Sequence, residues 1–244
     1  MFQRFRFNSL SATWYGLILL QFVMLYQPAL AQSDLAEENQ SNITTPLLAD
    51  NQLIHAIQLN RAYHVKQLLN KGHNPNTVDS QGNPMLILAL YEDAFDAAWV
   101  LLEHPRININ QANPHHETAL MLACLKGQIK IVKAMIQQHH AQINHSGWTA
   151  LHYAASTGQL EIARFLLQHH AEVDTRSPNG TTPLMMAARG GHIHVAKLLL
   201  DMGADVFLKN TIGLNAADFA ERYHQNEIAS GLRSRMDKLK ALEH

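Results

Sequence analysis

Residues 149–174 read TALHYAASTGQLEIARFLLQHHAEVD, and residues 182–206 read TPLMMAARGGHIHVAKLLLDMGADV. The two stretches match position by position when they are offset by 33 residues. A repeat of this length is typical of an array in which each unit packs against the next one. Weaker copies lie on both sides, and the six copies start near residues 51, 83, 118, 149, 182 and 215.

Each copy of the repeat encodes two short helices. Thr149 and Thr182 begin the first helix, because a threonine side chain caps free backbone N–H groups and a following proline is tolerated. Gly158 and Gly191 end it, because glycine adopts a left-handed backbone conformation at little cost. A second helix with an apolar face follows, and one unit cannot bury that face alone. The pattern therefore predicts an all-α solenoid of about six helix-turn-helix repeats.

These motifs resemble ankyrin repeats. The family's Thr-Pro-Leu-His signature appears as Thr-Ala-Leu-His at residues 149–152 and as Thr-Pro-Leu-Met at residues 182–185, and its Gly-Ala-Asp motif appears at residues 203–205. The resemblance covers roughly residues 47–232. It implies β-hairpin-like finger loops between repeats, and it implies that a partner protein binds on the concave face formed by the fingers and the first helices.

Two departures from the family pattern affect the expected geometry. The second copy has Tyr91, Glu92 and Asp93 where a glycine should end the first helix. The loop around residues 144–147 is about three residues shorter than the loop after the fourth copy. We therefore expect an altered finger between repeats three and four.

The N-terminal residues have a different character. Arg4 and Arg6 precede an apolar run at residues 14–26, and small residues at 29–31 follow it. This order is typical of a secretory signal peptide, and the run is shorter than the roughly 20 residues that span a membrane. An uncleaved anchor is the alternative. We predict a signal peptide at 1–31, a polar linker at 32–46, the repeat domain at 47–232 and a charged tail at 233–244.

The overall composition restricts the compartment and the partners. The net charge is −1, so the chain has no electrostatic reason to bind nucleic acid. Its single cysteine, Cys124, excludes a disulfide framework and reads as a small buried residue. Export without disulfides favours the bacterial periplasm, with secretion as the alternative. We expect a monomer that does not stay inserted in a membrane after signal cleavage.

No pattern in the chain points to catalysis. The sequence has no nucleophile elbow, no glycine-rich phosphate loop and no HExxH motif, so we predict neither an enzyme nor a cofactor. Paired histidines at 139–140 and 169–170 occupy the same place in successive copies, which opens a metal-binding alternative. Stacked repeats lie about 10 Å apart, whereas metal ligands lie about 2.0–2.1 Å from one ion. We therefore assign no metal ligand, and we read His152 and His192 as structural.

The ankyrin resemblance implies where a partner contacts the chain. The positions concerned are the residue before each helix-capping Thr and the two residues before each helix-ending glycine. Large aromatic residues and Arg dominate interface energies, often at about 2 kcal/mol or more each. Trp148 is the strongest candidate, unless the short loop folds it onto its neighbour. The predicted partner-binding residues are Trp148, Tyr91, Leu125, Lys126, Arg189, Thr181, Glu117 and Tyr223.

The sequence therefore predicts a non-catalytic scaffold for protein–protein interaction in the bacterial envelope. Two specific versions stay open, namely an immunity protein that neutralises an exported toxin and an accessory protein of a periplasmic enzyme. Metal capture by the stacked histidine loops is an alternative of another class, and a secreted effector delivered to a host is a third.

Overall fold

The computed structural model of the chain describes residues 51–242. The predicted signal peptide and linker lie outside the described residues. The described part consists of paired helices without a named strand, which confirms the predicted all-α solenoid. In chain order the helices are α2 (Asn51–Gln58), α3 (Ala62–Asn70), α4 (Met85–Tyr91), α5 (Phe95–Leu102), α6 (Ala119–Leu125), α7 (Ile129–Gln137), α8 (Ala150–Ser156), α9 (Leu160–Gln168), α10 (Pro183–Arg189), α11 (Ile193–Asp201), α12 (Ala216–Arg222) and α13 (Asn226–Leu242).

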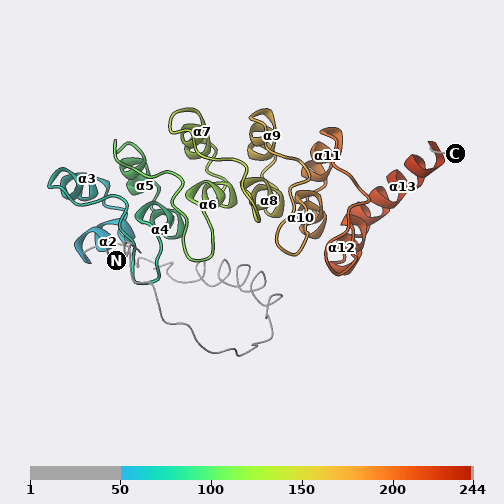
Figure 1. The fold of residues 1–244 in the computed structure, drawn as a ribbon, viewed down its shortest axis with the longest axis horizontal. Coiled ribbons are helices and arrows are strands. Elements are labelled where there is room, and N and C mark those ends of the chain that lie inside the picture. The colour runs from blue at the N-terminus through green and yellow to red at the C-terminus, as the bar shows by residue number, and fades with distance from the viewer. Residues whose placement is uncertain (1–50, 243–244) are drawn as a thin grey trace, which may run out of the picture. The chain divides into compact units, whose positions relative to one another are not determined.

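The helices form two parallel rows. Figure 1 shows the first helices of the repeats, α2 to α12 in even numbers, side by side in one row and the second helices α3 to α11 in the other. Helix α10 packs against both α8 and α12, as a stacked array requires. Ala154, Ala155, Ala187 and Ala188 are fully buried, and their small side chains let neighbouring first helices approach closely.

The starts of the first helices agree with the sequence pattern. Thr118, Thr149, Thr182 and Asn215 are the residues that precede α6, α8, α10 and α12, with extended backbone conformations. The Asn215 side chain accepts a hydrogen bond from the Asp218 backbone N–H at 3.0 Å. Such caps satisfy N–H groups that have no partner inside the helix.

The first helices end at a left-handed residue in every repeat. Gly127, Gly158 and Gly191 have φ angles of 69°, 72° and 74° at this position. In the second repeat, which lacks the glycine, Asp93 adopts the same conformation with φ 54°. Asp and Asn tolerate this region better than other non-glycine residues, so the departure in sequence does not change the turn.

Four of the connections between repeats share one finger geometry. The backbone N–H of a residue at the base of the finger donates to the carbonyl four residues later, at 2.9 to 3.0 Å, in the pairs Asp79–Asn83, Asn113–Glu117, Ser177–Thr181 and Asn210–Leu214. Isolated antiparallel bridges join Val78 to Pro84 and Ala112 to Thr118. These bonds are the β-hairpin-like part of the expected fingers.

The connection between repeats three and four is different. It has twelve residues (138–149), whereas the next connection has fourteen (169–182), so it is two residues shorter rather than three. Within the described chain, this is the connection between repeats that lacks the finger hydrogen bond. The expected alteration of this finger therefore takes the form of a missing finger tip.

The C-terminal boundary differs from the sequence interpretation. Helix α13 runs without interruption from Asn226 to Leu242, so residues 233–242 belong to the array rather than to a separate tail. Leu232 and Met236 are buried, and Arg233 pairs with Asp218 at 2.8 Å and with Glu221 at 3.0 Å. This apolar stripe was hidden in the sequence by the many charges around it. Among residues 51–242, no helix is long and apolar enough to cross a membrane.

Candidate partner-binding site

A buried carboxylate organises the surface formed by repeats two to four. Glu117 lies directly before the capping residue Thr118, and only 4% of the surface of Glu117 is exposed. Its carboxylate accepts hydrogen bonds from the Tyr91 hydroxyl, from the Tyr153 hydroxyl at 2.9 Å and from the Asn113 amide at 2.9 Å. Tyr91 ends α4 and Tyr153 lies in α8, so one side chain ties three repeats together.

The electrostatics of this cluster keep both tyrosines protonated. Burial raises the pKa of Tyr91 and of Tyr153, and the negative charge of Glu117 raises both further. Each hydroxyl therefore remains a donor to the carboxylate throughout the physiological range. Hydrogen bonds to a charged acceptor contribute about 1.5–3 kcal/mol each, so the cluster fixes the orientation of two large aromatic side chains.

A second group of contacts surrounds Trp148. Its ring meets the His152 ring edge-on, with centroids 5.2 Å apart and an interplanar angle of 75°. His152 is 1% exposed, accepts from the Thr149 backbone N–H at 3.1 Å, and lies 3.0 Å from the Thr181 carbonyl oxygen. Burial lowers the pKa of His152 to about 4, so this histidine is neutral at pH 7. Trp148 thus packs against a neutral imidazole ring that is held in place by hydrogen bonds, and Trp148 itself is half-buried.

The short connection next to Trp148 holds an unsatisfied polar atom. The Nδ1 atom of His145 lies 2.9 Å from the Ser146 carbonyl oxygen. Its Nε2 atom is buried and has no hydrogen-bond partner among the described residues. Buried polar atoms in native proteins nearly always have a partner, so this atom is an exception within the described residues.

The third group lies at the C-terminal end of the array. The Arg189 guanidinium lies over the Tyr223 ring, with its central carbon 4.7 Å from the ring centroid. Arg189 ends α10 and Tyr223 follows α12, so the pair bridges repeats five and six. A cation–π contact of this kind contributes about 0.5–1 kcal/mol at an exposed site.

Comparison with family models identifies the repeats. A family described as ankyrin repeats in three copies matches residues 107–177, and one described as ankyrin repeats in many copies matches residues 157–200. Residues 107–200 therefore contain ankyrin repeats. No curated protein matches the chain. Ankyrin repeats are generally modules for protein–protein interaction. Each of the three groups of side chains described above contains at least one residue at a position that the family resemblance implies.

Half of the predicted partner-binding residues lie below the surface of the ankyrin array. Thr181, Glu117 and Leu125 are 2%, 4% and 6% exposed, and the Lys126 side chain is 6% exposed and paired with Asp93 at 2.8 Å. These four were expected to face a partner. Their bonds and burial place them beneath the surface, where they support it. The half-buried members are Tyr91, Trp148, Arg189 and Tyr223, whose role in binding stays a prediction.

Sequence reasoning missed two members of the central cluster. The Tyr153 hydroxyl donates a hydrogen bond to Glu117, which lies 36 positions earlier in the chain. The Asn113 side chain accepts a hydrogen bond from the Glu117 backbone N–H and donates one to the Glu117 carboxylate. The signal for Asn113 is its place at the base of a finger, where Asp79 and Asn210 have the same role. No comparable signal marks Tyr153, because its partner depends on how far neighbouring repeats rotate.

The positions of the paired histidines are explained by the backbone conformation. His140 and His170 have φ angles of 52° and 65°, where Gly72 and Gly203 have 100° and 92° in other ankyrin repeats. They therefore stand at left-handed positions that glycine usually fills. Among residues 51–242, no group of three His, Cys, Asp or Glu side chains converges to hold a metal ion. Cys124 is fully buried, and burial raises the pKa of its thiol.

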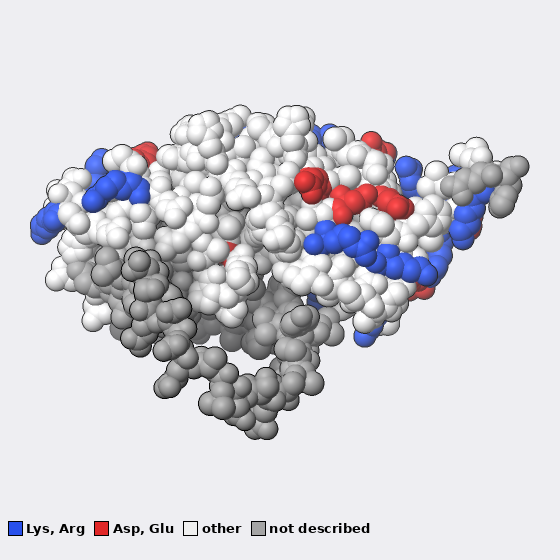
Figure 2. Space-filling model, viewed as in Figure 1, with Lys and Arg blue, Asp and Glu red and all other residues white. Residues whose placement is uncertain are grey.

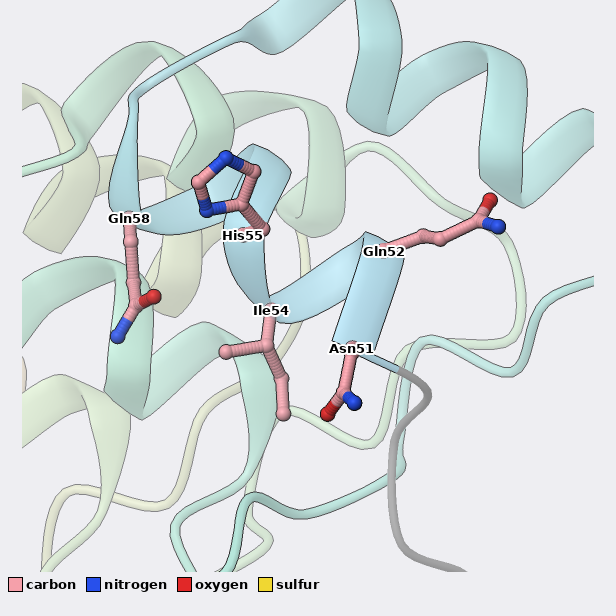
Figure 3. Close-up of a pocket in the computed structure, with 5 residues that line it drawn as sticks. All are labelled: Asn51, Gln52, Ile54, His55 and Gln58. Carbon is pink, nitrogen blue, oxygen red and sulfur yellow. The ribbon is translucent and has the colours of Figure 1, made fainter.

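A shallow pocket lies on the first described helix. Figure 3 shows that its lining side chains all come from α2. A pocket made by one helix has no opposing wall, so it gives a ligand few convergent contacts. We assign it no role in binding. The lining residues are Asn51, Gln52, Ile54, His55 and Gln58.

Proposed function

We propose that this ankyrin-repeat protein is a non-catalytic scaffold of the bacterial envelope that binds one partner protein on its concave surface. The central contact is the surface of Tyr91, Trp148 and Tyr153 in repeats two to four. The observation that carries the proposal is the buried Glu117, whose hydrogen bonds hold two tyrosines of different repeats at the edge of one surface.

Pre-organisation is the physical argument for this surface. Binding normally costs about 0.5–1.5 kcal/mol for each flexible side chain that becomes ordered. Tyr91 and Tyr153 are already held by Glu117, and Trp148 is already packed against His152. The three aromatic side chains can therefore contribute contact area without this loss, as the central residues of strong interfaces do.

The missing finger tip next to Trp148 gives the partner access. The neighbouring fingers at 113–117 and 177–181 each have the backbone hydrogen bond that closes the finger. The described connection at 138–149 lacks this bond.

The place of action is the bacterial envelope. Support comes from the signal-like sequence at 1–31 and from a repeat domain that folds around apolar side chains without disulfides. The two versions are an immunity protein for an exported toxin and an accessory protein of a periplasmic enzyme. The identity of a captured partner separates them.

The test combines capture with a measured affinity. The purified chain is immobilised, exposed to an envelope extract of the source organism, and the retained protein is identified and purified. The dissociation constant is then measured by calorimetry for the native chain and for Tyr91→Ala with Trp148→Ala. We expect the double variant to raise the dissociation constant at least about 30-fold, because interface aromatics contribute about 2 kcal/mol or more.

A matched control tests whether the loss of affinity is specific to this surface or follows from removing any aromatic side chain. Tyr63 is 76% exposed on α3 and belongs to none of the three groups. Tyr63→Ala is expected to leave the affinity unchanged. If Tyr63→Ala weakens binding and the double variant does not, the partner contacts the other row of helices and the proposed site is wrong.

A further inference from the structure

The C-terminal finger loops carry basic residues at a position that is uncharged in the N-terminal ones. The residue directly before the base of each finger is Val78 or Ala112 in the first repeats, but Arg176 or Lys209 in the later ones. Both cations are exposed, and neither forms an ion pair with another residue of the described chain. The position is buried at Val78 and exposed at Ala112, Arg176 and Lys209, so both cations lie on exposed loops and the helical framework does not require their charge.

These cations are ordered in a row. The Arg176 guanidinium donates to the Lys209 carbonyl at 2.6 Å, which fixes it across the boundary between two repeats. The Lys240 ammonium of α13 lies 5.9 Å from the centroid of the Phe207 ring, and Phe207 precedes Lys209 by two residues in the chain. Figure 2 shows basic side chains forming a band across the C-terminal part of the face, while the middle of the face has few charges. We call Arg176, Lys209 and Lys240 the basic band.

Acidic residues of the same loops limit the width of the band. Glu172 and Asp205 occupy equivalent positions four residues before Arg176 and Lys209, where Asn74 and Asn108 stand in the first repeats. The Asp205 backbone N–H donates to the Asp174 carboxylate at 3.0 Å, which keeps these loops together. Figure 2 shows the acidic group beside the basic one. A broad polyanion, such as a nucleic acid duplex or a bilayer surface, would meet both rows and be repelled by one.

We propose that the basic band docks an acidic, extended segment of a protein partner. A single extended chain is narrow enough to follow the cations without touching the acidic row. Neighbouring repeats lie about 10 Å apart, and three residues of a polyproline II helix advance about 9 Å and return to the same face. A segment with an acidic residue at every third position therefore matches the spacing of the equivalent positions that carry Arg176 and Lys209.

This inference goes beyond the proposed function, since it names a second surface and the chemistry of its ligand. None of the three cations belongs to the Tyr91–Trp148–Tyr153 surface. Failure of one site therefore leaves the other intact. The capture experiment tests the aromatic surface, whereas a synthetic peptide tests the basic band alone.

The probe is a fluorescein-labelled peptide of four Glu-Pro-Pro triplets. Its binding to the full chain is followed by fluorescence anisotropy at low ionic strength. The comparison peptide has the same composition with its four glutamates placed together at one end. We expect the triplet peptide to bind several-fold more tightly, and we expect added salt to release it, because screening weakens exposed charges.

Two triple variants locate the binding. Arg176→Gln with Lys209→Gln and Lys240→Gln should weaken the triplet peptide about tenfold, as the loss of three exposed ion pairs predicts. The control replaces three exposed cations at the other end of the array by Gln, at Arg61, Lys66 and Lys71, and should change nothing. Equal weakening in the two variants would mean that net charge, rather than the basic band, binds the peptide.

Two further outcomes would overturn the proposal. If a single-stranded oligonucleotide of twelve residues binds more tightly than the peptide and loses affinity in the band variant, the ligand is a nucleic acid. If both peptides bind equally, or neither binds at low salt, the band does not recognise a spaced acidic segment. Circular dichroism of each variant shows that the helices are retained, so a loss of binding reports the surface.

Discussion

The first three repeats and the last three share a framework and differ on its exposed positions. In both halves an asparagine or aspartate of one loop accepts a bond from the next loop, as Asn76 does from the Asn108 N–H at 2.7 Å and Asp174 does from the Asp205 N–H. Two loop positions are uncharged in the first half, with Asn74 and Val78 or Asn108 and Ala112, and charged in the second half, with Glu172 and Arg176 or Asp205 and Lys209. The hydrogen bonds between loops therefore connect the repeats in both halves, while the loop positions outside these bonds distinguish the two surfaces.

The short connection at 138–149 separates these halves. The surface organised by Glu117 spans it, with Tyr91 on its N-terminal side and Tyr153 on its C-terminal side, whereas Arg176 and Lys209 lie only on its C-terminal side. The difference teaches that a repeat protein can carry two kinds of recognition surface without changing its helices. Each prediction below tests either the shared framework or one of the differences.

The largest expected effect tests the framework itself. Leu101 in α5 and Leu199 in α11 occupy the same position of their repeats, and both are fully buried. Each Leu→Ala substitution should lower the free energy of unfolding by about 3 kcal/mol, because it removes buried methyl groups and leaves a cavity. Urea unfolding followed by circular dichroism measures both. Costs that differ by more than a factor of two would show that the halves are not packed alike.

The next effect concerns the carboxylate of the first half. Glu117→Gln keeps the shape but replaces one acceptor oxygen by an amide nitrogen, so at least one hydrogen bond to the carboxylate is lost. We expect the free energy of unfolding to fall by about 2 kcal/mol, since buried donors without a partner are unfavourable. Thermal denaturation measures the change.

An exposed glutamate serves as the control for this substitution. Glu161 pairs with Lys133 at 3.1 Å, and its side chain is 69% exposed. Glu161→Gln should change stability by no more than about 0.5 kcal/mol, as exposed pairs usually do. Similar losses in the two variants would contradict the organising role of Glu117.

How much of this could be predicted depends on the range of each interaction. The helix starts at Thr118 and Thr182 depend on hydrogen bonds from the backbone N–H three residues later to the threonine side chain. Such short-range interactions can be predicted from the sequence, and both starts were predicted. The left-handed turn at Asp93 was found only in the structure, because Asp fills that conformation less often than glycine. The Tyr153–Glu117 bond joins residues of different repeats, so it depends on a stacking rotation that no local pattern encodes.

A pH effect should arise at His152 in repeat four. His152 occupies the position at which Met121 and Met185 contact the N–H of the capping residue. Its pKa is about 4 when folded and about 6.5 in the unfolded chain, so the unfolded state binds the proton more readily. This contribution to stability is complete above pH 6.5 and is lost as the pH falls toward 4.

The expected loss is about 2 kcal/mol between pH 6.5 and pH 5, at about 1.36 kcal/mol per pH unit for one proton. Urea unfolding at several pH values measures it. His152→Met supplies the residue that the neighbouring repeats have, and it should remove this part of the pH dependence. If the native chain and His152→Met lose the same stability on acidification, another group is responsible.

The smallest effect compares one backbone position in repeats four and five. His170 has φ 65° and Gly203 has φ 92°, and the two residues are equivalent in the alignment of the repeats. A non-glycine residue in this region is unfavourable by about 1–2 kcal/mol, which the extra freedom of unfolded glycine offsets in part. His170→Gly should therefore raise the free energy of unfolding by about 0.5 kcal/mol, and Gly203→His should lower it by a similar amount. A Cβ atom added at Gly203 meets no heavy atom within 4 Å, so the reciprocal change introduces no clash at this atom and reports mainly the backbone. Loss of stability in His170→Gly would mean that the imidazole contributes a contact that outweighs its strained backbone.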